Sequence, residues 1–132
     1  MPHEHLAHIP LDLGYLYAYG MGVRKNRNKA TQYYELAAAL NITEGYLNLA
    51  KLALKMSGSE YRQRAIGYLV IAKKIGSEEA EEQLRLLEVL IARADIEKGK
   101  RLIDKIEIEL ARTAVKFFPS WRDPNFPPWR DS

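Results

Sequence analysis

The sequence predicts an all-α fold, a solenoid of about three helix-turn-helix repeats followed by a C-terminal tail rich in proline and tryptophan. Three observations lead to this prediction. Apolar residues recur at spacings of three and four, as on one face of a helix, and no segment alternates strictly as a half-buried strand would. The apolar pattern also repeats along the chain. Glycine and serine stand between the helical segments, where a helical hairpin has to turn.

The internal repeat is visible in two sets of residues. The first set contains leucines that recur after 36 and then 35 positions: Leu13 and Leu16, Leu49 and Leu52, Leu84 and Leu87. The second set recurs after 35 positions, from Lys29, Ala30, Tyr33, Ala37 and Asn41 to Arg64, Ala65, Tyr68, Ala72 and Gly76. A fixed period of this length indicates that each unit is one helical hairpin that stacks on the next.

The turn signals divide the chain into six expected helices, at about 10–20, 27–40, 43–56, 60–75, 77–95 and 98–117. Gly20, Gly58 and Gly76 mark ends of these helices, because glycine can adopt the left-handed conformation that closes a last turn. Gly67 lies inside the fourth helix, which indicates either a close helix contact or a tolerated cost of about 1 kcal/mol. We expect residues 1–117 to form one repeat domain and residues 118–132 an extended tail.

The first unit carries a specific residue pattern. It consists of Leu13, Gly14, Leu16, Tyr17, Gly20, Gly22, Val23, Lys29, Ala30, Tyr33, Tyr34, Ala37 and Ala38. This pattern resembles the Sel1-like repeat, a relative of the tetratricopeptide repeat. The second unit keeps the leucines and alanines but has Ser57, Gly58 and Ser59 at the turn, and the third diverges further, as terminal repeats commonly do.

The resemblance implies a right-handed superhelix in which the first helix of each hairpin lines a concave surface. It also implies a protein-protein interaction module that holds another protein or peptide. Some bacterial relatives look like immunity proteins, which bind and neutralise a toxin, and this is the most concrete version of the prediction. A generic adaptor or scaffold in signalling or secretion is the alternative, and an association between copies of the chain is left open.

Helical geometry selects six residues of the first helices that lie outside the leucine stripe and are expected to face this groove. They are Asp12, Tyr15 and Tyr19 in the first unit, and Asn48, Lys51 and Lys55 at the equivalent positions of the second. Tyrosine offers a large contact area at a low entropic cost, and lysine favours an acidic partner. The competing interpretation is that the lysines are a solvated face and the tyrosines are partly core.

The tail contains a tandem of eight residues. Phe118, Pro119, Trp121, Arg122 and Asp123 recur as Phe126, Pro127, Trp129, Arg130 and Asp131. Proline at this density excludes a regular helix, while the two tryptophans are large apolar anchors. We expect the tail to pack as a cap on the open end of the stack, at Leu86, Val89 and Leu90. The alternative is that Trp121, Arg122, Trp129 and Arg130 bind a partner or a neighbouring copy.

Other function classes receive less support. Arg24, Lys25, Arg27 and Lys29 could let the 24–29 turn contact nucleic acid, but a solvated loop is favoured because no aromatic residues are interleaved with them. The net charge of +3 arises from 20 basic and 17 acidic side chains spread along the chain, so it adds little to that case.

Catalysis and bound cofactors are not expected. The sequence has no cysteine, no glycine-rich phosphate loop and no serine in a nucleophile-elbow pattern. His3, His5 and His8 could bind a metal, but the neighbouring prolines argue against one regular helix there, and we expect neither a metal nor a cofactor. No apolar run approaches the roughly 20 residues that span a bilayer.

Overall fold

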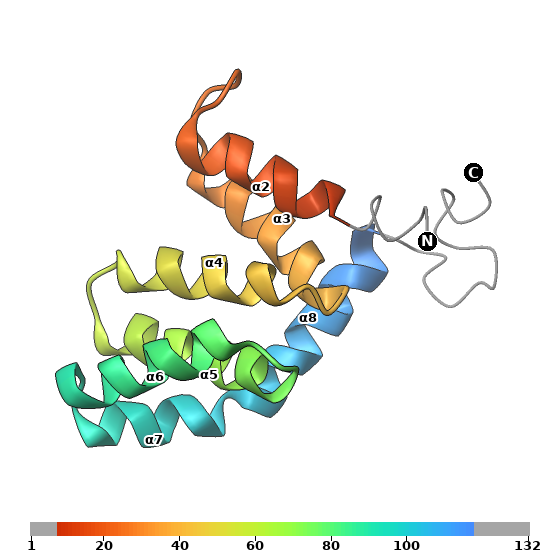
Figure 1. Cartoon of the computed structure of the whole chain (residues 1–132). Coiled ribbons are helices and arrows are strands. Elements are labelled where there is room, and N and C mark those ends of the chain that lie inside the picture. The colour runs from red at the N-terminus through yellow and green to blue at the C-terminus, as the bar shows by residue number, and fades with distance from the viewer. Residues whose placement is uncertain (1–7, 118–132) are drawn as a thin grey trace.

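The computed structural model describes residues 8–117, and this part of the chain is built from helices without a strand (Figure 1). The helices are α2 Ile9–Tyr19, α3 Arg27–Ala39, α4 Thr43–Leu54, α5 Ser59–Lys74, α6 Glu78–Leu90, α7 Arg93–Arg101 and α8 Ile103–Phe117. The first four begin and end within two residues of the predicted bounds. Two hairpins, α2–α3 and α4–α5, stack as an α-solenoid. The third unit, α6 and α7, packs on α5 through both of its helices, and α8 follows it.

The boundaries predicted for the last two helices were wrong. A single helix was expected over 77–95, but α6 ends at Leu90, and Ile91 and Ala92 take extended backbone angles before α7 begins. A second break follows at Leu102, so that α8 starts five residues later than expected. The two breaks let α7 lie against α5 and let α8 cross over to pack on both α3 and α5.

The ends of α3 and α5 confirm the 35-residue period at the level of single hydrogen bonds. The Ile42 amide donates to the carbonyl of Ala37 at 3.0 Å, and the Ser77 amide donates to Ala72 at the same distance. Between each pair lies a residue with positive φ, Asn41 at 62° in the first repeat and glycine at 105° in the second. Both helices therefore end in the same left-handed cap.

Small residues allow the helices to approach one another closely. A Cβ atom added to Gly45 of α4 would lie 2.6 Å from the amide nitrogen of Ala38 in α3. One added to Gly67 of α5 would lie 2.6 Å from a methyl group of Ile106 in α8 and 3.2 Å from the carbonyl oxygen of Gly99 in α7. Gly67 therefore marks a close helix contact, which answers the question that the sequence left open.

Helix α8 crosses the second helices of the first two hairpins instead of extending the stack. Figure 1 shows it running at an angle to the other helices, and most of its contacts are with α3 and α5. Ile106 is fully buried there, and Leu110 and Ala114, at spacings of four, continue the buried stripe. Together with Tyr34, Ile66 and Leu69, α8 completes one continuous core. The other side of the stack is left to the first helices, α2, α4 and α6.

Candidate functional site

The outward sides of α2, α4 and α6 form what we call the first-helix face. Its residues are Asp12, Tyr15 and Tyr19 of α2, Lys51 and Lys55 of α4, and Leu86, Val89 and Leu90 of α6. Asp12, Tyr19 and both lysines are exposed, and Tyr15 is half-buried. Five of the six residues predicted for the groove therefore lie at a surface.

Asn48 is the exception, because only 6% of its surface is exposed. Its side-chain amide donates to the carbonyl of Glu44 at 2.7 Å and to the hydroxyl of Tyr15 at 3.1 Å. The second bond joins α4 to α2, so Asn48 holds the two first helices side by side. Asn48 therefore supports the first-helix face from the buried side of α4. Little of its surface is left to contact a partner.

The two tyrosines form the α2 end of the face. The rings of Tyr15 and Tyr19 are stacked with centroids 6.4 Å apart, and Tyr15 also packs edge-on against Tyr34 at 5.8 Å. Tyr34 is fully buried, and burial is the main reason that its pKa is raised. Tyr15 is thus fixed by ring contacts and a hydrogen bond, while 60% of the Tyr19 surface is exposed. Because Tyr15 is already held in place, it loses little entropy on binding.

Lys51 and Lys55 occupy the middle of the face. They are one helical turn apart on α4, and neither makes an ion pair or a side-chain hydrogen bond with residues 8–117. Asp12, the acidic member of the predicted set, is also exposed and makes no side-chain bond within that range. Two adjacent positive charges are therefore available to an acidic group.

The sequence prediction missed the part of the face that α6 contributes. Leu86, Val89 and Leu90 are exposed by 60, 84 and 78%, respectively. They had been assigned to the end of the stack beneath the tail, but the tail lies outside the described residues. The repeat period was the signal that could have placed them, because Leu86 and Leu90 follow Lys51 and Lys55 by 35 positions.

The basic turn between α2 and α3 is partly committed to internal contacts. The Arg27 guanidinium donates to the carbonyl of Leu52 near the end of α4, and the Lys29 ammonium lies 5.1 Å from the centre of the Tyr17 ring. Arg24 and Lys25 are exposed. Half of the proposed phosphate-binding set therefore has a structural role, which weakens the case for a nucleic-acid site.

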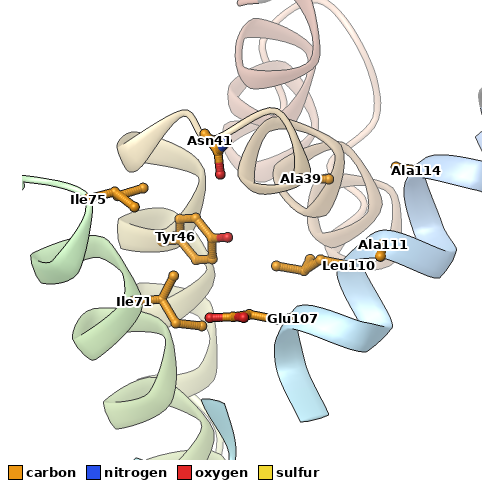
Figure 2. Close-up of a pocket in the computed structure, with 9 residues that line it drawn as sticks. All are labelled: Ala39, Asn41, Tyr46, Ile71, Ile75, Glu107, Leu110, Ala111 and Ala114. Carbon is orange, nitrogen blue, oxygen red and sulfur yellow. The ribbon is translucent and has the colours of Figure 1, made fainter. Parts of the chain in front are cut away.

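A cavity of about 320 Å³ lies on the opposite side, where α8 crosses the ends of α3 and α5. Figure 2 shows Leu110 and Glu107 of α8 pointing across it toward Tyr46 and Ile71. Burial, helped by the Glu107 carboxylate and by Tyr68, raises the pKa of Tyr46 to about 12, so this hydroxyl stays protonated. The wall is mainly apolar.

A part-buried polar cluster fastens α8 to α5. The Arg64 guanidinium donates to the Tyr68 hydroxyl at 2.8 Å and to the Glu109 carboxylate. Burial raises the pKa of Glu35 in α3, while Arg64 opposes this shift and Glu109 adds to it. The cluster bridges three helices by hydrogen bonds and charge, and nothing in it requires a bound substrate.

Residues 8–117 contain neither a cluster of metal ligands nor a helix that could span a membrane. No three histidine, aspartate or glutamate side chains in that range are placed to hold a metal ion, and His3 and His5 lie outside it. None of the helices described is both long and apolar enough to cross a membrane. The tail residues Trp121, Arg122, Trp129 and Arg130, and with them the predicted cap, likewise lie outside the described residues.

The stacked hairpins define the chain as a helical repeat protein. Residues 11–42, which span most of α2 and all of α3, match the family model of the Sel1 repeat. The resemblance noted in the first unit is thereby confirmed, and residues 11–42 form a Sel1 repeat. Sel1 repeats generally mediate interactions between proteins, so the chain is a protein-interaction module. No curated protein and no solved structure matches the chain.

Proposed function

We propose that the protein binds another protein or peptide through the first-helix face and carries out no catalysis of its own. The observation that carries the proposal is the pair Lys51 and Lys55, which make no ion pair within residues 8–117, beside the exposed ring of Tyr19. Tyrosine and cationic side chains on a rigid support are the residues from which binding surfaces are made. By contrast, the charges of Arg64 and Glu109 are paired with each other.

A photo-cross-linking amino acid tests this surface in living cells. We expect a discrete adduct when it replaces Tyr19 and none when it replaces Arg112, an exposed residue of α8. Adding Lys51→Glu and Lys55→Glu to the first variant should abolish the adduct while the helical content is unchanged. Equal adducts from positions 19 and 112, or an adduct that survives the charge reversal, would contradict the proposal.

The more specific proposal is a bacterial immunity protein that neutralises a toxin. The resemblance to Sel1-like proteins supports it, and a generic adaptor is the alternative that uses the same face. The deciding experiment is to express the protein encoded beside this gene, alone and together with the chain. An immunity role predicts growth arrest by the neighbouring protein alone, relief by the chain, and loss of relief with Lys51→Glu and Lys55→Glu. A harmless neighbour would refute immunity and leave the adaptor.

A further inference from the structure

We propose that the partner segment is acidic and carries large apolar side chains beside its acidic residues. This inference rests on the proposed function and deepens it, because it names the chemistry that the first-helix face accepts. It depends on the third repeat, where Leu86, Val89 and Leu90 extend the face beyond the lysines of the second.

The repeat register places the three surfaces in line. Tyr15 and Tyr19 of α2 correspond to Lys51 and Lys55 of α4 after 36 positions, and these correspond to Leu86 and Leu90 of α6 after 35. The bond between Asn48 and Tyr15 shows that α2 and α4 lie side by side at this face. A segment that crosses the C-terminal halves of the first helices therefore meets tyrosines, then lysines, then leucines.

The α6 surface is too apolar to be an ordinary solvated face. Single exposed leucines are common on proteins, but these three apolar side chains adjoin one another at spacings of three and four on one helix. Contiguous apolar patches on a protein surface mark interaction sites. Leu84, only two residues from Leu86, is 7% exposed and shows that α6 already supplies a separate buried side to the core.

No acidic side chain within residues 8–117 forms an ion pair with Lys51 or Lys55. Glu44 and Glu79 lie in the first turns of α4 and α6, where negative charge is stabilised by the helix dipole. Seven residues separate Glu44 from Lys51, which corresponds to about 10 Å along a helix and exceeds the screening length of roughly 8 Å in physiological salt. Acidic side chains of a partner are therefore the complementary group.

Two other occupants fit less well. The tail has apolar anchors, but residues 118–132 contain two arginines and two aspartates and so offer no net charge to the lysines. A second copy joined by a two-fold axis through α4 would bring Lys51 and Lys55 against the same lysines. A separate acidic and apolar segment satisfies both surfaces at once.

Selection of a displayed library of random 12-residue peptides on the full-length protein tests the inference. We expect selected sequences to be at least several-fold enriched in aspartate and glutamate next to large apolar residues. Selection on the variant Lys51→Glu, Lys55→Glu should instead enrich lysine and arginine. Selection on Leu86→Ser, Leu90→Ser should keep the acidic preference and lose the apolar one.

The outcomes separate this inference from the proposed function. Selected peptides that are not enriched in acidic residues, but that no longer bind the variant Tyr19→Ala, would overturn the inference and leave the face as a binding site. Peptides that bind all of these variants equally would overturn both. Failure to enrich any sequence above background would overturn the inference as well.

A single introduced cysteine identifies what covers α6, because the sequence contains none of its own. An environment-sensitive fluorophore on Val89→Cys should shift to shorter wavelength when a selected peptide is added, and the same label on Arg112→Cys should not. A shift that appears without peptide and grows with protein concentration would assign the surface to a second copy. A shift without peptide that disappears with Trp121→Ser and Trp129→Ser would assign it to the tail. Either result would overturn the proposal.

Discussion

Two leucines of α6, two residues apart, offer a direct test of the predicted packing register. Leu84 belongs to the stripe that recurs through Leu49 and Leu13, and it is 7% exposed, whereas Leu86 is 60% exposed. The substitutions Leu84→Ala and Leu86→Ala remove the same atoms from the same helix. We expect them to differ sharply in their effect on the free energy of unfolding.

The expected magnitudes follow from burial. Leucine to alanine removes three carbon atoms, each worth about 0.8 kcal/mol when fully buried, so Leu84→Ala loses about 2 kcal/mol before any cavity cost. The added cost of the cavity should be small because α5 is the main helix that packs on α6. The expected loss of unfolding free energy for Leu84→Ala is therefore about 2–3 kcal/mol. Leu86→Ala should cost less than about 1 kcal/mol. Leu49→Ala, in a helix packed on both α3 and α5, should cost about 3–5 kcal/mol.

Urea unfolding followed by far-ultraviolet circular dichroism measures all three substitutions under the same conditions. Leu84→Ala should lower the midpoint clearly and Leu86→Ala should hardly move it, with equal slopes for both. Equal losses at the two positions would refute the register, and with it the alignment of Leu86 with Lys51 on the first-helix face.

Three further predictions concern single contacts. Gly99→Ala should destabilise by about 1–3 kcal/mol in urea unfolding, despite the better helix propensity of alanine, because its Cβ would lie 2.5 Å from the Gln63 carbonyl oxygen in α5; an unchanged midpoint would contradict that contact. Asn48→Ala should cost about 1–2 kcal/mol by removing the bond between α4 and α2, and a neutral effect would show that the bond is not needed. Burial raises the pKa of Glu35 above 4.5, so its ionisation lowers stability as the pH rises through that raised value. Glu35→Gln should therefore be more stable than the parent at neutral pH and equal to it below pH 4.5. If thermal melts show the parent to be more stable at neutral pH, the attraction of Arg64 for the Glu35 carboxylate is larger than the cost of burying that charge.

The first four helices could be predicted because their signals are local. The leucine and alanine spacing fixes which side of each helix is buried, and the turn residues fix where each helix ends. Asn41 and Gly76 were aligned from the sequence alone, and both adopt positive φ in equivalent caps. Local rules and the fold agree throughout this part of the chain.

The break after α6 could not be predicted because no local signal marks it. Residues 86–98 contain neither glycine nor proline, and their sequence is compatible with one continuous helix. Contacts with α5 decide the matter: Asp95 accepts a hydrogen bond from Gln63 at 2.9 Å, and Ile96 is buried. The spacing of apolar residues within one helix does not reveal which residues it contacts in a helix far away in the sequence.

The repeat register predicted only part of the candidate site. The register identified the positions of Tyr15, Lys51 and Lys55, but it could not show that Asn48 is buried, because its partner Tyr15 belongs to another repeat. Leu86 was missed for a related reason, since an apolar residue near the end of a stack is ordinarily assigned to packing.

The contrast between buried and exposed positions of the repeat is the physical reason to place recognition on the first-helix face. Leu49 and Leu84 keep the same residue in successive repeats because each fills equivalent space in the core. The exposed positions beside them change from Tyr19 to Lys55 to Leu90 in successive repeats. Solubility alone would favour charge at every exposed position, and it would not select leucine at the most exposed end of the face. A partner whose chemistry changes along its length accounts for all three.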